Sequence, residues 1–138
     1  MKHEQIKGRL IKALVDFFED DYRRINHAIE VLKYAEQTIT DHAEADEEIV
    51  IASAILHDVG IKPSEAQLGY NNGKTQEQYG PAIATTLLTD NDFPPEKIEK
   101  VAQIIGNHHS PSRYDYIELE ILKTADRIVN KIDAEQPC

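Results

Sequence analysis

Residues 49–56 read Ile49-Val50-Ile51-Ala52-Ser53-Ala54-Ile55-Leu56, and His57-Asp58-Val59-Gly60 follows directly. Apart from Ser53 the first of these runs is apolar on every side of a helix, which is typical of a central helix buried on most sides. Asp46 is expected to cap this helix, and Glu47 and Glu48 suit the positive end of its dipole. The stretch therefore predicts a buried central helix.

The rest of the chain repeats apolar residues at helical spacing, and no segment shows the sustained alternation typical of a strand. Gly60 and Pro63 are expected to end the central helix, and a loop rich in Gly and Asn is expected to run to about Lys74. The predicted fold class is therefore all-α, a single-domain bundle of about six helices. These helices are expected at residues 6–18, 22–41, 46–59, 75–88, 94–109 and 116–132.

The length and charge of the chain limit what it can be. At 138 residues we expect one domain, spanning 1–138. Its 25 acidic and 15 basic residues give a formal net charge of −10, which repels nucleic-acid backbones and anionic lipid. No apolar run is long enough to span a membrane, no targeting segment is expected, and the one thiol, Cys138, fits a reducing compartment. We therefore expect a cytoplasmic protein that binds neither a nucleic-acid polymer nor a membrane.

Four ionisable residues lie where a helical core would normally hold apolar side chains: His27, His57, Asp58 and Asp126. Burying an unpaired carboxylate is costly, so each aspartate must be paired, protonated or bound to a metal. Taken singly, each histidine could be a hydrogen-bonded core residue, and each aspartate could cap a helix or pair with an arginine. Taken together, the four are better explained by one divalent cation.

The order of these residues, with the sequence around them, carries a family resemblance. They occur in the segments Arg24-Ile25-Asn26-His27-Ala28-Ile29-Glu30-Val31-Leu32-Lys33-Tyr34-Ala35, Ala54-Ile55-Leu56-His57-Asp58-Val59-Gly60 and Thr124-Ala125-Asp126-Arg127. These segments resemble the metal-binding signature of the HD-domain superfamily of metal-dependent phosphohydrolases, over a core of about residues 20–132. The resemblance implies an all-α core with a divalent metal at its centre, and hydrolysis of phosphate esters.

The resemblance assigns the metal to His27, His57, Asp58 and Asp126, and it gives His57 and Asp58 the catalytic positions. Two imidazoles and two carboxylates suit Mn, Fe, Co, Ni, Zn or Mg and do not choose among them. The ion would lower the pKa of a bound water and neutralise charge on the phosphoryl oxygens. Asp58 or Asp126 could accept a proton from that water. One divalent metal ion is therefore the expected cofactor.

The resemblance leaves a second metal open. Binuclear members of the superfamily hold a second ion with a histidine pair, which corresponds here to His108 and His109, and with one further histidine. The segment where that further histidine is expected contains Gln76 instead, which favours a single metal. His108 and His109 are then expected to contact substrate.

A phosphate group needs cationic partners, and an acidic chain has few of them near the candidate ligands. Arg23 and Arg24 lie one helical turn before His27, while Lys62 and Lys74 bracket the loop that is expected to cover the site. The predicted substrate contacts are therefore Arg24, Lys62, Lys74, His108 and His109.

The sequence thus predicts a metal-dependent phosphohydrolase that cleaves a phosphate ester of a small molecule such as a nucleotide. A phosphodiester or pyrophosphate hydrolase of the same fold is one alternative, and a non-catalytic module that binds a metal or a nucleotide is another. Phe17 and Phe18 could serve either the core or self-association, so a homo-oligomer stays open.

Overall fold

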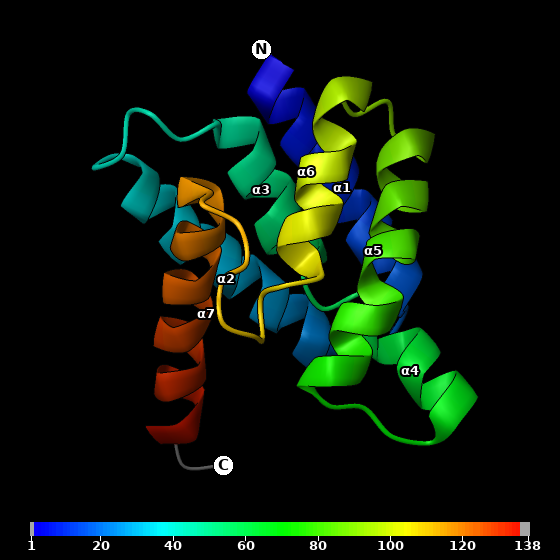
Figure 1. The fold of residues 1–138 in the computed structure, drawn as a ribbon. Helices are drawn as coiled ribbons and strands as arrows, with labels where there is room; N and C mark the ends of the chain where they lie inside the picture. Colours follow the sequence, from blue (N-terminus) through cyan, green and yellow to red (C-terminus); the bar gives the residue numbers. More distant parts are fainter. Residues whose placement is uncertain (1, 136–138) are drawn as a thin grey trace.

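Seven α-helices make up the part of the chain that the structure describes (Figure 1). The computed structural model describes the backbone of residues 2–135 and the side chains of residues 4–134. The helices are α1 (Lys2–Phe18), α2 (Tyr22–Ile39), α3 (Glu47–Leu56), α4 (Ile61–Leu68), α5 (Gly73–Asp90), α6 (Pro95–Ile105) and α7 (Ile117–Glu135). No strand occurs in this range, so the all-α prediction is confirmed. No helix in it is both long and apolar enough to cross a membrane.

The helix α3 is the buried centre that its sequence predicts. Every residue from Ile49 to Leu56 is buried, and the side chain of Asp46 caps the helix by accepting a hydrogen bond of 3.2 Å from the Ile49 N–H. The helices α1, α2, α6 and α7 all pack against α3. Figure 1 shows α2 lying against α7 and α5 against α6, so the bundle brings residues from distant parts of the sequence together around α3.

The helix α4 is the main departure from the sequence prediction, which placed a loop here. Pro63 is the third residue of α4, so it lies in the first turn, where a missing N–H is tolerated because that group has no intrahelical acceptor. The helix ends at Gly69, which adopts a left-handed conformation with φ of 80°. Only a short connection then leads to α5, which the Asn72 side chain caps by accepting a hydrogen bond from the Thr75 N–H.

Two glycines let the junction between α3 and α4 pack closely on α5. A Cβ atom on Gly60 would lie 2.5 Å from the Gln76 carbonyl oxygen and 2.8 Å from the Gly80 backbone nitrogen. A Cβ atom on Gly80 would lie 2.8 Å from Cγ2 of Ile105 on α6. These contacts fix the C-terminal end of α3 against α5 and α6.

Candidate metal centre

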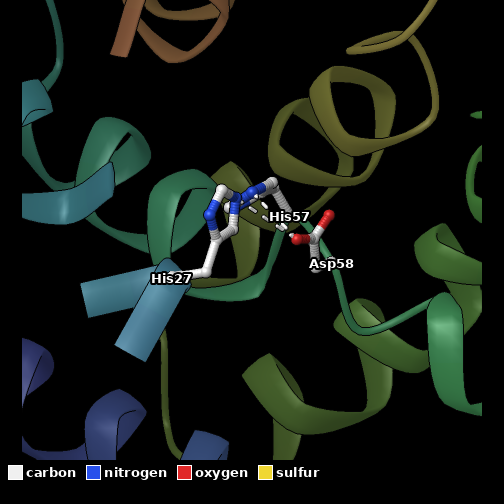
Figure 2. Close-up of side chains that lie close together, drawn as sticks. All are labelled: His27, His57 and Asp58. Atoms are coloured by element: carbon white, nitrogen blue, oxygen red, sulfur yellow. Dashed lines mark ion pairs between the residues drawn. The ribbon is translucent and has the colours of Figure 1, made fainter. Parts of the chain in front are cut away.

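The four residues predicted to bind metal meet at the C-terminal end of α3. His27 lies in α2, Asp126 lies in α7, and His57 and Asp58 follow α3 directly. The Nε2 atom of His27 lies 3.0 Å from an oxygen of Asp126 and 3.6 Å from an oxygen of Asp58. The Nε2 atom of His57 lies 3.3 Å from Asp58 and 3.5 Å from Asp126. Figure 2 shows the side chains of His27, His57 and Asp58 converging on one point.

The end of α3 explains how two adjacent residues reach one site. Successive side chains on an α-helix diverge by about 100°, which would normally separate His57 from Asp58. The helix ends at Leu56, however, and His57 and Asp58 lie in the turn that connects it to α4. Their side chains therefore approach one another to 3.3 Å.

Two buried ring nitrogens provide the test of whether these residues fit a metal. In His57 and His108, Nδ1 lies 2.8 Å and 2.7 Å from the carbonyl oxygens of Ala54 and Ile105, to which it donates a hydrogen bond. With Nδ1 as the donor, Nε2 is the ring atom that can offer a lone pair to a metal when it carries no proton. Both Nε2 atoms are buried without a hydrogen-bond partner among the described residues, which is costly unless a ligand satisfies them. Imidazole nitrogens beside carboxylates suit a divalent transition metal, so the residues present fit one.

The charges around this point favour a cation. Burial alone would lower the pKa of His57, but the carboxylates of Asp58 and Asp126 outweigh burial and hold that pKa well above its ordinary value. Burial alone would raise the pKa of Asp58, but His57 and His108 hold it well below its usual range. The hydrogen bond to His27 and the nearby ring of His57 likewise outweigh burial and lower the pKa of Asp126. The carboxylates that favour a proton on His57 would favour a metal ion in the same way.

Asp133 is a residue of the centre that the sequence analysis missed. Its Oδ2 atom lies 3.7 Å from Nδ1 of His27, on the side of the ring away from the other ligands. A carboxylate at Nδ1 favours a proton there and leaves Nε2 free to bind a metal. Asp133 follows Asp126 by two helical turns and lies on the same face of α7, and this spacing is the signal that could have identified it.

The C-terminal end of α6 brings His108 and His109 to the same carboxylate. The Nε2 atom of His108 lies 3.8 Å from Asp58, and ligand atoms of Asp58, His108 and His109 all lie within 4.8 Å of one another. The Nε2 atom of His109 lies 2.6 Å from Oε1 of Gln76, so Gln76 is a neighbour of the pair. Burial and the nearby His108 lower the pKa of His109 and favour its neutral form. These three residues form a second possible ligand group that shares Asp58 with the first.

A cavity of about 1000 Å³ opens beside His27 and Asp58. The predicted substrate contact Arg24 lines it, but both terminal nitrogens of Arg24 donate hydrogen bonds to Glu65 on α4, at 3.0 and 3.1 Å. Arg23 also lines the cavity, and its side chain has no hydrogen-bond or ion-pair partner among the described residues. Arg23 is therefore the cation of this cavity that is free to bind an anion.

Lys62, a predicted substrate contact, lies away from this cavity. Lys62 does not line the cavity, because the first turn of α4 directs it toward the end of α1. There its ammonium group donates hydrogen bonds to the Phe17 carbonyl oxygen at 2.6 Å and to Glu19 at 3.0 Å. Lys74 is exposed in the first turn of α5 and does not line the cavity either, so the expectation that both lysines border a loop over this site is not met.

The fold and motifs of the chain also occur in known proteins. The crystal structure of a predicted HD superfamily hydrolase from an uncultured Thermotogales bacterium matches this fold with a TM-score of 0.65 and 24% sequence identity. The match covers 91% of this chain and 72% of that one. No curated protein matches the sequence. The HD domain family matches residues 24–131, a range that contains His27, the His57-Asp58 doublet and Asp126. The chain therefore belongs to the HD domain family.

Proposed function

We propose that the chain is a cytoplasmic, metal-dependent phosphohydrolase that removes the phosphate group from a small phosphate monoester. One observation carries the proposal. The buried Nε2 atom of His57 has no hydrogen-bond partner in the described part of the chain and lies 3.3 and 3.5 Å from the carboxylates of Asp58 and Asp126, beside an open cavity. Membership of the HD domain family supports hydrolysis at this centre.

The residues that would hold the ion are His27, His57, Asp58 and Asp126. When bound, a divalent ion lowers the pKa of water and neutralises charge on phosphoryl oxygens. Asp58 lines the cavity, and its low pKa keeps it ionised, so it can accept a hydrogen bond from a water there and orient that water. In the hydrolysis, the water oxygen bonds to phosphorus, the ester P–O bond breaks, and a proton from the water reaches the oxygen of the leaving alcohol.

The substrate phosphate would lie against Arg23. A guanidinium group binds phosphate oxygens through two parallel hydrogen bonds, and none of the described residues competes for Arg23. Arg24 contributes positive charge from a fixed position, because Glu65 holds both of its terminal nitrogens. His108 and His109 would contact the substrate or hold a second ion from their position beside Asp58.

The test compares the wild-type chain with the Asp58→Asn variant. Wild-type protein is expected to bind one divalent ion and to release inorganic phosphate from a monoester, as measured by elemental analysis and phosphate release with added Mn, Ni, Co or Mg. Asp58→Asn is expected to lose the metal and at least about 100-fold in turnover, because Asp58 lies next to His57 and also to His108. Asp41→Asn, an exposed aspartate between α2 and α3, is the matched control.

Two outcomes would contradict the proposal. Metal-loaded protein that cleaves diesters or pyrophosphate but no monoester would indicate a different hydrolase of the same fold. Metal-loaded protein that hydrolyses none of these and yet binds a nucleotide with sub-micromolar affinity would indicate a non-catalytic module.

A further inference from the structure

The two helices that carry His27 and Asp126 also form the walls of the cavity. On α2, Arg23 lies four residues before His27 and Glu30 three residues after it, on one face of the helix, and Asn26 directly precedes His27. On α7, Asn130 and Asp133 follow Asp126 by four and seven residues, which also places them on one face. The helices pack against each other, so these polar side chains line the same cavity beside the metal centre.

Three of these wall residues have unused hydrogen-bonding capacity. The side chains of Asn26, Glu30 and Asn130 make no hydrogen bond or ion pair with any described residue. Each carboxamide offers two donors and one acceptor, and the carboxylate offers only acceptors. A ligand hydroxyl can donate to a carboxylate and exchange hydrogen bonds with a carboxamide, so this set is complementary to a molecule with several hydroxyl groups.

The cavity offers little to a nucleobase. Among its described lining residues only Ile61 and Ala134 are apolar, and the one aromatic ring is that of His27, which is assigned to the metal. Proteins hold bases largely by stacking them on aromatic side chains, and ligand sites for flat apolar groups have mostly apolar walls. The polar walls therefore suit the polar part of a substrate.

The charges of the cavity suit a single phosphate group. Its cations are Arg23 and Arg24, and Arg24 already pairs with Glu65. Its acidic lining residues are Glu30, Asp58 and Asp133. A second or third phosphate group would meet carboxylates and no further cation among the described lining residues, and repulsion between like charges would oppose its binding.

From these observations we infer that the substrate is the phosphate monoester of a sugar or another small polyhydroxylated alcohol. The inference rests on the proposed function and adds the class of the alcohol. Glu30 and Asn130 are assigned to the substrate hydroxyls, and Arg23 to the phosphate. The ribose of a nucleoside monophosphate would add favourable contacts with the cavity walls, whereas its base would not.

The test uses three substrates that share a primary phosphate ester. Ribose 5-phosphate and pentyl phosphate have the same number of carbons and differ in the hydroxyl-bearing ring, while adenosine 5′-monophosphate adds a base to the ribose. The kcat/KM of the full-length chain is measured with the divalent ion that gives the highest rate. The kcat/KM for ribose 5-phosphate is expected to exceed that for pentyl phosphate by at least about tenfold. The kcat/KM for adenosine 5′-monophosphate is expected to be no higher than that for ribose 5-phosphate.

Two variants test whether the preference for ribose 5-phosphate comes from the polar residues that line the cavity. Glu30→Gln and Asn130→Ala are each expected to lower the ratio of kcat/KM for ribose 5-phosphate over pentyl phosphate by about tenfold. Glu96→Gln, on an exposed residue of α6 that does not line the cavity, is the control that keeps the wild-type ratio. Both wall residues are exposed on helices, so neither substitution is expected to disturb folding.

The outcomes separate this inference from the proposed function. No hydrolysis of any of the three substrates would contradict the proposed function. Hydrolysis with pentyl phosphate equal to ribose 5-phosphate, or with adenosine 5′-monophosphate at least about tenfold better than ribose 5-phosphate, would overturn the inference and leave the phosphohydrolase intact. Unchanged substrate ratios in both wall variants would also overturn it.

Discussion

Each of three histidines beside Asp58 has a neighbour at Nδ1 that decides how the ring faces the centre. For His57 and His108 that neighbour is a backbone carbonyl at 2.8 and 2.7 Å, in α3 and α6 respectively. Because the acceptor is backbone, no side-chain substitution removes it. For His27 it is the carboxylate of Asp133 at 3.7 Å. His27 is therefore the candidate ligand whose orientation depends on a replaceable side chain, and that dependence can be measured.

Asp133→Ala is expected to weaken metal binding by about tenfold, because partners of this kind fix the ring and its proton and typically contribute 10–100-fold in affinity. The measurement is the metal dissociation constant of the chelator-stripped chain, determined by calorimetry or by competition with a coloured chelator. Asp41→Ala removes an exposed aspartate elsewhere and should keep the wild-type affinity. An unchanged affinity in Asp133→Ala would show that a separation of 3.7 Å is too long for Asp133 to orient His27.

At the scale of whole helices, the sequence predicts a helix well where an apolar run must be buried. It predicts helix boundaries poorly where one residue type is compatible with both the start and the end of a helix. The apolar run of α3 has one reasonable position in a bundle, and the structure buries it. A proline stops a helix when it follows one but is tolerated in a first turn. The sequence alone does not decide between these cases for Pro63, which the structure places in the first turn of α4. The sequence did not predict α4, and an expected loop leaves open the direction in which the Lys62 side chain points.

The same reasoning explains which site residues the sequence could supply. His27, the His57-Asp58 doublet and Asp126 are unusual in an apolar setting and match a family motif, so they are recognisable one by one. Glu30, Asn130 and Asp133 are ordinary surface residue types. They gain a role only because α2 packs on α7, and that pairing comes from the tertiary structure.

The close approach of α4 to α5 gives a prediction about stability. Gly60→Ala would place Cβ 2.5 Å from the Gln76 carbonyl oxygen, so backbone must move, and we expect a loss of about 1–3 kcal/mol in the free energy of unfolding. Gly8→Ala is the matched control, because an added Cβ on this exposed residue of α1 meets nothing within 4 Å. Gly8→Ala should gain up to about 1 kcal/mol from helix propensity. Urea denaturation measures both, and equal stabilities for Gly60→Ala and the wild type would show that the junction tolerates a side chain.

For the molecule as a whole, the candidate centre connects helices that the chain places far apart. His27 and Asp126 are 99 positions apart in sequence, and the segment that carries His57 and Asp58 lies between them. The net charge of −10 describes the surface as a whole, while at the centre two aspartates lie among histidines and would be neutralised further by a divalent ion. An ion bound here would therefore stabilise the packing of α2, α3 and α7 together.

This connection makes metal binding measurable as global stability. The unfolded chain does not hold the four ligands together, so an ion that binds only the folded state should stabilise it by about 2.7 kcal/mol at 100 times its dissociation constant. For a chain of this size that corresponds to a rise in Tm of about 10 °C, which calorimetry of the chelator-stripped chain with increasing Mn²⁺ would detect. Asp58→Asn should show no such rise, whereas Asp41→Asn should match the wild type. A wild-type Tm that is independent of Mn²⁺, Ni²⁺, Co²⁺ and Mg²⁺ alike would mean that these side chains pair with one another in the folded protein rather than with an ion.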